Sequence, residues 1–276
     1  MQNFNRVIPD SPERPLLMKL RPLLLREKLF WRLYKKQANK FLCLFENASL
    51  EFAPKISLNL MPTDISHRQI AFLGFIELAV SRRIAELAKA GGLMVDVGAN
   101  YGYYSCIWAA AGEQNQVIAF EVSPKNSSAL KMNVTRNRLQ SQVKVYEKAL
   151  GKEDGSFPFT LGPDDQSGWG GLLSKGQDNQ DGTVEVQVVT LDDFLAKSEH
   201  EHIDVLKIDT EGADTWVLQG AEHLLRSHKI CHIFFEENTV RMSALGIQPG
   251  EAQNLLRDCG YRLEHLNSGE WYASSR

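Results

Sequence analysis

The chain has 276 residues with 31 basic and 34 acidic side chains, and its net charge is −3. With 43% hydrophobic and 24% charged residues, the composition is close to the globular average and excludes both a wholly basic nucleic-acid binder and an acidic disordered chain. The near-neutral total conceals an asymmetry, because residues 1–40 carry a net charge of +7 and residues 41–276 carry −10.

The first 65 residues are predicted to form an extension, followed by a domain over residues 66–276. Residues 1–15 hold three prolines, lack the pattern of a signal peptide and are expected to be disordered. The segment 18–41 has eight Lys/Arg and one Glu, with leucines at helical spacing, and predicts one basic helix with an apolar face. Weak alternation over Ser49–Leu60 predicts one or two short strands.

The cysteines and the apolar segments indicate the compartment. The four cysteines lie far apart and form no CxxC pair, which argues against a zinc site or a disulfide scaffold and favours a reducing, cytoplasmic location. The longest apolar stretch, Ile70–Ser81, contains Glu77 and is too short to span a bilayer.

From residue 66 onward, helices and strands are predicted to alternate. This order predicts an α/β fold with a mostly parallel sheet, covered on both faces and closed by an antiparallel C-terminal hairpin. The expected elements are one or two helices over Ser66–Ala90, strand Leu93–Val97, helix Tyr103–Ala111, strand Gln116–Val122, helix Lys125–Arg138, strand Val143–Ala149, a hairpin of Phe157–Leu161 and Thr183–Val189, strand Ile203–Asp209, helix Ala213–Ser227, strand His232–Glu236, helix Gly250–Cys259 and a hairpin of Arg262–Leu266 and Glu270–Ala273.

The most informative motif follows the first strand of this series. Asp96 ends the strand, and a turn with Gly98 and Gly102 leads into a helix, where open α/β sheets bind their ligands. The pattern D-x-G-x-x-x-G differs from the G-x-G-x-x-G that cradles a dinucleotide pyrophosphate. Because Asp96 repels a phosphate and attracts a cation, the motif favours S-adenosylmethionine over NAD. The turn residues Gly98, Ala99, Asn100, Tyr101 and Gly102 are therefore candidate cofactor contacts.

A second acid ends the next strand. Glu121 stands 25 residues after Asp96, where a carboxylate can accept hydrogen bonds from both hydroxyls of a ribose. NAD sites use the same device, so Glu121 alone does not discriminate between the two cofactors. Glu77, in the helical region before the first strand, is a candidate partner for the amino group of the cofactor, or a solvated surface residue.

These motifs together resemble the FkbM-type S-adenosylmethionine-dependent methyltransferases. The resemblance rests on Asp96–Ser105, on Phe120-Glu121 with Pro124, and on the segment Lys207–Ala213, with support from Gly74–Glu77 and Val217–Ala221, and covers roughly residues 66–240. Glu-Val-Ser-Pro stands where the family often has Glu-Pro-x-Pro, and residues 1–48 match no motif. The resemblance implies a class I, Rossmann-like seven-stranded fold and methyl transfer, usually to a hydroxyl of a sugar, polyketide or lipid.

Three acids follow the fourth and fifth strands of the series. Asp209, Glu211 and Glu236 are expected to converge beside the methyl donor, since the carboxyl ends of parallel strands share one edge. They could act as a base for a hydroxyl acceptor, could hold a divalent cation such as Mg²⁺, or could cap the helix that follows, with Thr210. A long glycine-rich loop, Gly162–Gly182, could close over the acceptor through Trp169 or be a plain insertion.

The partners remain open at this point. A small-molecule or glycan acceptor is expected, and nucleic acid is not, because the body is acidic and the Asn/Asp-Pro-Pro-Tyr motif is absent. The basic segment 18–41 could pack on the body, on a second copy or on an anionic membrane surface, or could contact a phosphorylated or acidic acceptor. An NAD-dependent oxidoreductase and a non-catalytic scaffold remain as alternative functions.

Overall fold

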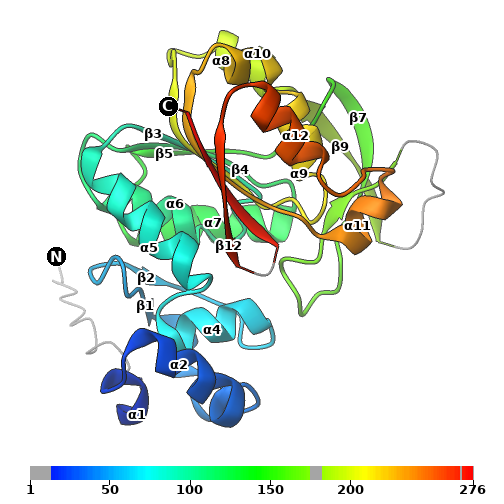
Figure 1. Ribbon diagram of the computed structural model, residues 1–276. Coiled ribbons are helices and arrows are strands. Elements are labelled where there is room, and N and C mark those ends of the chain that lie inside the picture. Colours follow the sequence, from blue (N-terminus) through cyan, green and yellow to red (C-terminus); the bar gives the residue numbers. More distant parts are fainter. Residues whose placement is uncertain (1–13, 175–181, 268, 276) are drawn as a thin grey trace, which may run out of the picture.

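The computed structural model describes residues 14–174, 182–267 and 269–275. A seven-stranded sheet occupies the centre of the molecule, with the strand order β12-β13-β11-β10-β3-β4-β5 (Figure 1). The five strands from β11 to β5 are parallel, and β13 is antiparallel to both its neighbours. The strands are β3 (Leu93–Val97), β4 (Gln116–Phe120), β5 (Val143–Tyr146), β10 (Ile203–Ile208), β11 (Ile230–Glu236), β12 (Arg262–Asn267) and β13 (Glu270–Ser274). This is the class I methyltransferase topology that the sequence predicted.

Helices cover both faces of this sheet. One apolar cluster joins the sheet to α5 (Leu78–Leu87), α6 (Tyr103–Ala110) and α7 (Pro124–Arg136). A second cluster on the opposite face joins the sheet to α8 (Leu191–Ala196), α9 (Asp214–Gln219), α10 (Glu222–Arg226) and α12 (Glu251–Asp258). In β3 the side chain of Met94 belongs to the first cluster and those of its neighbours Leu93 and Val95 to the second, as expected for a strand buried on both faces.

A smaller sheet lies beside the main one and carries part of the long loop. Its order is β6-β9-β7-β8, and β7 (Gly155–Thr160) and β9 (Thr183–Val189) form the predicted antiparallel hairpin. The other members are β6 (Ala149–Leu150) and β8 (Gly171–Leu172), which lies within the glycine-rich loop. Residues 175–181 of that loop lie outside the described residues. A third apolar cluster packs this sheet against α9 and α11 (Thr239–Ala244).

The prediction of one continuous helix over residues 18–41 is wrong. The segment folds instead as α1 (Leu16–Lys19), α2 (Leu23–Leu29), the π-helical η1 (Phe30–Tyr34) and the 3₁₀-helical η2 (Ala38–Lys40). Pro22 causes the first break, because its ring disfavours helical backbone at the preceding residue, and it stands at the N-cap of α2. The expected disorder of residues 1–15 falls almost wholly outside the described residues.

The rest of the extension leads into the main domain through α3 (Cys43–Glu46), the two predicted short strands β1 (Ala48–Ser49) and β2 (Ser57–Leu58), and α4 (Ile65–Leu73). Gly74, at a φ of +89°, ends α4 and separates it from α5, which η3 (Ala88–Ala90) extends. Among the described helices, none is both long and apolar enough to cross a membrane.

Candidate functional site

The turn between β3 and α6 lies against the end of β10. Gly98 adopts a φ of +76°, and a Cβ added there would lie 1.9 Å from the carbonyl oxygen of Asp209. Gly102, at a φ of +86°, faces Leu130 in the same way, with 2.3 Å to Cδ1. Both positions therefore require glycine for backbone conformation and for close packing. This packing brings the motif turn and Asp209 to one edge of the sheet, as the sequence predicted.

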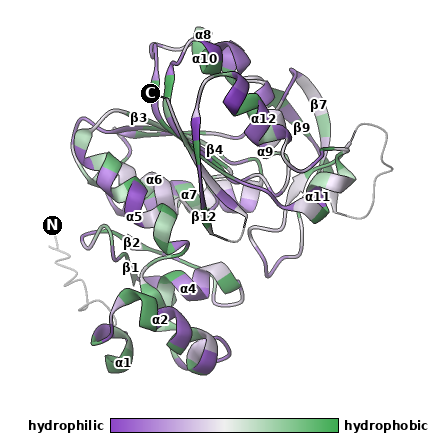
Figure 2. Cartoon of the chain, viewed as in Figure 1, coloured by the Kyte–Doolittle hydropathy of each residue, from purple (hydrophilic) through white to green (hydrophobic). Residues whose placement is uncertain are grey.

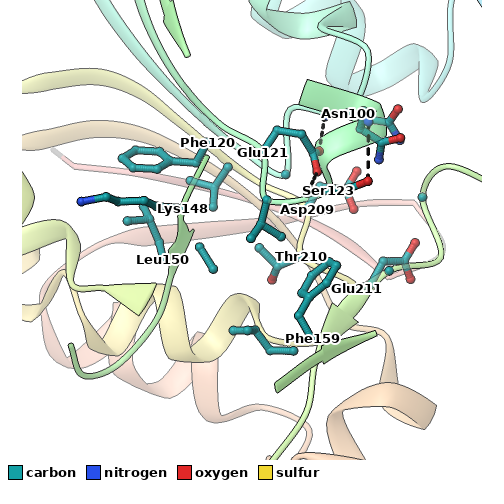
Figure 3. Close-up of a pocket in the computed structure, with 18 of the residues that line it drawn as sticks. Asn100, Phe120, Glu121, Ser123, Lys148, Leu150, Phe159, Asp209, Thr210 and Glu211 are labelled. Carbon is teal, nitrogen blue, oxygen red and sulfur yellow. Dashed lines mark hydrogen bonds between the residues drawn. The ribbon is translucent and has the colours of Figure 1, made fainter. Parts of the chain in front are cut away.

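The first cavity opens at this edge (Figure 3). Its walls come from the motif turn, the end of β4, the β5–β6 connection, the glycine-rich loop and the end of β10. The residues that line it include Gly98, Asn100, Phe120, Glu121, Ser123, Asn126, Lys148, Leu150, Phe159, Ser167, Gly168, Asp209, Thr210 and Glu211.

Glu121 lies in the wall of the first cavity, and its two carboxylate oxygens accept hydrogen bonds from the turns that follow β3 and β4. Oε2 accepts a hydrogen bond from the backbone N–H of Asn100 at 2.8 Å, and Oε1 accepts one from the N–H of Ser123 at 2.8 Å. Burial raises the pKa of Glu121 to about 7, against the effect of these two hydrogen bonds. A carboxylate has about four acceptor positions, so acceptor capacity remains for a ligand even with the Asn126 side chain also in contact.

A second cavity lies between the motif turn, β2 and α4. Its wall combines aromatic and aliphatic side chains with Asp96, His67, Lys207 and Asp209. Asp96 is buried and accepts a hydrogen bond from Ser105 Oγ at 2.5 Å, and burial raises its pKa to about 6. Gly98, Asn100 and Asp209 line both cavities, which therefore meet at these three residues.

A buried lysine lies beside Asp209. Lys207 Nζ is 3.6 Å from Asp209 Oδ2 and 3.9 Å from Glu77 Oε2, and it lies 5.5 Å from the centre of the Tyr104 ring. Burial lowers the pKa of Lys207, but the carboxylates of Asp209 and Glu77 outweigh that effect and raise it above its ordinary value. Glu77 also accepts a hydrogen bond from Tyr104 Oη at 2.7 Å. Glu77 is not among the described residues that line either cavity, and its role as a cofactor contact stays a prediction.

The three predicted acids of the fourth and fifth strands are only partly brought together. Asp209 and Glu211 line the first cavity, whereas Glu236 is not among the described residues that line either one. Glu211, at a φ of +55°, lies 3.8 Å from Arg241 Nε, and its pKa is raised to about 7 by burial and then by Asp209. Glu236 stands directly opposite Glu270 in the β11–β13 register. Burial, followed by neighbouring carboxylates, raises the pKa of Glu236 to about 7 and of Glu270 to about 8.

The alternative roles of these acids can be compared with the geometry. Within the described ranges, no three His, Cys, Asp or Glu side chains are placed so that they could hold one metal ion. The metal alternative, which needs Asp209, Glu211 and Glu236 together, is therefore not supported by this arrangement. Thr210 does not accept from the helix, since its Oγ1 donates to Asp214 Oδ1 at 2.5 Å and α9 has no side-chain cap.

The glycine-rich loop crosses the first cavity and is attached at Ser167. The backbone N–H and the Oγ of Ser167 both donate to Asp64 Oδ2, at 2.7 and 3.0 Å. Ser167 Oγ also accepts from Asn100 Nδ2 at 3.0 Å and lies 3.2 Å from His67 Nε2, while its carbonyl accepts from Asn126 Nδ2 at 2.8 Å. Further along, Arg241 Nη2 donates to the carbonyl of Trp169 at 3.0 Å, and the indole ring remains half exposed. The loop is thus tied to α4 with its N-cap Asp64, to the motif turn, to α7 and to α11.

We expect Ser167→Ala to increase the dissociation rate of a ligand from the first cavity by about tenfold. The variant removes one hydroxyl that contacts Asp64, His67 and Asn100, each hydrogen bond being worth about 1 kcal/mol. Stopped-flow displacement of bound cofactor product measures the rate. Ser174→Ala, at the far end of the same loop, is the matched control, because among the described residues the hydrogen-bond partner of Ser174 Oγ is the Ala244 carbonyl at 3.4 Å, and Ser174 does not line either cavity. Equal rates in both variants would show that Ser167 does not hold the loop closed.

The acids with raised pKa values predict how stability depends on pH. A carboxyl group whose pKa is higher in the folded than in the unfolded chain stabilises the fold while protonated, and this contribution is lost as the pH rises through the folded value. His67, whose pKa burial lowers, acts in the opposite direction, but only below its ordinary value of 6.5. We therefore expect the free energy of unfolding to fall between about pH 6.5 and pH 8.

Urea unfolding of the ligand-free protein across this range measures the effect. The buried Glu121, with a pKa of about 7, is expected to contribute a slope of roughly 1 kcal/mol per pH unit in the lower part of the range. Glu121→Gln removes that contribution and should flatten the curve, whereas Glu199→Gln, on an exposed side chain, should not. Stability that rises with pH in the wild type would contradict the assignment.

Some residues of the site were not identified from sequence. Lys207 lies within the family-like segment, but nothing in its spacing indicated a buried cation. A single His67 carries no motif in the sequence; the structure places it in the first turn of α4, where Asp64 is the N-cap and accepts from the backbone N–H of His67 at 2.9 Å. Ser167 had no local signal, because its partners come from distant segments.

Comparison with known proteins agrees with this geometry. The family model described as "Methyltransferase FkbM domain" matches residues 96–263. Similar curated proteins include "Methyltransferase 1" of Beauveria bassiana, 28% identical over 146 residues, which are 47% of this chain and 58% of that protein. "Hexuronic acid methyltransferase AglP" of Haloferax volcanii is 26% identical over 202 residues, 72% of this chain and 77% of that protein. "2-O-methyltransferase NoeI" of Sinorhizobium fredii is 22% identical over 173 residues, 58% of this chain and 70% of that protein.

The family match covers more than half of the chain and includes the motif turn, Glu121 and the segment that carries Lys207 and Asp209. The strand order of the main sheet is the one that this fold requires. The chain therefore belongs to the FkbM methyltransferase family.

Proposed function

We propose that this protein transfers a methyl group from S-adenosylmethionine to a hydroxyl of a small molecule or glycan, with Asp209 as the general base. The observation that carries the proposal is the position of Asp209, a residue that lines both cavities. A group at this junction can reach the donor and the acceptor together. The names of two similar proteins, a hexuronic acid methyltransferase and a 2-O-methyltransferase, support a sugar as the acceptor class.

The residues around the two cavities fit this cofactor. Asn100 Oδ1 is buried without a hydrogen-bond partner in the described structure, so a ligand N–H or O–H would satisfy it. Glu121 keeps acceptor capacity for a ribose hydroxyl. Phe120 and Leu150 offer apolar surface for the nucleobase of the cofactor in the same cavity (Figure 3). Asp96 and Asp209 in the walls suit a ligand with positive charge and no phosphate.

The chain's own groups then account for the reaction. When bound, S-adenosylmethionine supplies an electrophilic methyl group. Asp209 accepts the proton of the acceptor hydroxyl, and general base catalysis of this kind contributes about 100- to 10,000-fold. Lys207, whose Nζ lies 3.6 Å from Asp209 Oδ2, positions the Asp209 carboxylate. The loop tied at Ser167 excludes water from the first cavity. Holding the reacting groups together is worth up to roughly 7–11 kcal/mol.

The test is a product analysis with methyl-deuterated S-adenosylmethionine and a panel of uronic acids, neutral sugars and oligosaccharides. We expect one acceptor class to gain a single labelled methyl group on oxygen, and the same acceptors with all hydroxyls blocked to gain none. Methylation of a nitrogen or carbon atom, or of the blocked acceptors, would contradict the proposed reaction.

A further inference from the structure

The N-terminal segment over residues 16–42 exposes an unusual amount of apolar surface. Eight of the twelve large apolar side chains that are exposed in the described structure lie within these 27 residues. Figure 2 shows hydrophobic and hydrophilic residues alternating along α1 and α2, which lie at one end of the molecule. We call this surface the N-terminal patch; its apolar members are Leu16, Leu17, Leu20, Leu24, Leu25, Trp31, Leu33 and Leu42.

The patch is supported from beneath by the body of the protein. Met18 and Phe30 are completely buried, and Tyr34 nearly so, in the same cluster that covers one face of the main sheet. The rings of Phe30 and Tyr34 lie 6.0 and 5.4 Å from that of Phe72 in α4. Arg26 pairs with Glu51 at 2.8 Å. The segment therefore packs on the body, as expected, through these buried side chains, whereas the leucines of the patch stay exposed.

The charges between these leucines are of one sign. Every exposed ionisable side chain from residue 16 to residue 42 is basic, and the single acid of the segment, Glu27, is partly buried. The exposed basic residues are Lys19, Arg21, Lys28, Arg32, Lys35, Lys36 and Lys40. Leucine and tryptophan interleaved with lysine and arginine are the composition of segments that lie in the interface of an anionic bilayer.

A second copy of the chain fits this surface less well. In a symmetric dimer the same patch would face itself, so that seven cations would oppose seven cations. An anionic lipid surface instead neutralises the basic residues while its acyl region accepts the leucines and Trp31. Charge complementarity thus favours an anionic lipid surface over a second copy of the chain.

We propose that the N-terminal patch binds the surface of membranes that contain anionic lipids. Flotation of the full-length protein with vesicles measures the binding directly. We expect the protein to float with phosphatidylcholine vesicles containing about a third phosphatidylglycerol, to remain unbound with pure phosphatidylcholine, and to be released by high salt.

Two sets of variants with matched controls identify the surface. The triple change Lys28→Glu, Arg32→Glu, Lys36→Glu should weaken binding by at least about 100-fold. The control Lys197→Glu, Lys229→Glu, Arg262→Glu makes the same change in net charge on exposed residues elsewhere and should bind nearly as the wild type. Leu16→Ser with Leu20→Ser and Leu24→Ser should abolish binding, whereas Met132→Ser with Val240→Ser, also exposed, should not.

Thermal unfolding of each variant shows whether the fold is kept. Failure of the wild-type protein to float with the anionic vesicles would overturn the proposal. It would equally be overturned by a wild-type dimer, seen by light scattering, that the three Leu→Ser changes dissociate, because the patch would then be an interface between copies. Neither result would bear on the methyltransfer proposal, which depends on the two cavities at the carboxyl ends of the strands.

Discussion

Asp209→Asn is expected to lower turnover by at least about 100-fold while leaving cofactor affinity within about threefold. The amide keeps the size of the side chain and a hydrogen-bonding oxygen but cannot accept the proton of a hydroxyl. Because Asp209 lines both cavities, its loss as a base should affect the chemical step rather than binding. Single-turnover kinetics with saturating cofactor, together with calorimetry of the cofactor product, separates the two quantities.

Two further variants make this test specific. Glu211→Gln changes the other acid of the first cavity, whose pKa of about 7 would also suit a base, and it should lower turnover less than Asp209→Asn. Asp258→Asn, on the exposed end of α12, is the surface control and should leave turnover unchanged. If Glu211→Gln proved the more damaging variant, or if Asp209→Asn kept its activity, the base would have to be reassigned.

Glu121→Ala is expected to weaken cofactor binding by at least about 100-fold. The change removes the acceptor proposed for the ribose hydroxyls and also leaves the N–H groups of Asn100 and Ser123 without their partner. Glu121→Gln keeps one oxygen acceptor and should lose less. Isothermal titration calorimetry with S-adenosylhomocysteine gives the dissociation constants.

A ligand lacking one hydroxyl separates ribose contact from damage to the turn. The 2′-deoxy form of S-adenosylhomocysteine should bind the wild type more weakly than the natural ligand, whereas Glu121→Ala should bind both equally weakly. Collapse of the turn alone would leave the preference for the hydroxyl intact. That outcome would show that Glu121 is structural and does not contact the ribose.

The sequence predicted the main sheet, its strand order through the family resemblance, and the motif turn, because each depends on local patterns. Leu93–Val97 is buried throughout, is apolar except for Asp96, and runs into glycines at positions that need a positive φ. The predicted family and fold are confirmed by the match over residues 96–263 and by the topology. The helix over residues 18–41 was predicted wrongly because periodicity outweighed Pro22, and the short helices α8 and α11 offered too few turns to give a pattern.

The candidate site was predictable only in part, for a physical reason. Asp96 lies near the end of β3, and Glu121 and Asp209 directly follow β4 and β10, so topology alone brings them to one edge. The ties between Ser167 and Asp64, 103 residues apart, and between Lys207 and Glu77 depend on how side chains from separate segments pack. Their roles, like those of the acids, remain predictions until variants are measured.

The binding of S-adenosylmethionine itself tests the account most directly. Isothermal titration calorimetry of the wild-type protein should show one molecule of S-adenosylmethionine bound per chain, should show binding of S-adenosylhomocysteine at the same site, and should show none of NAD. Binding of NAD in place of S-adenosylmethionine would indicate an oxidoreductase. Binding of none of the three would indicate a scaffold that kept the fold without the chemistry, and either result would contradict the proposed function.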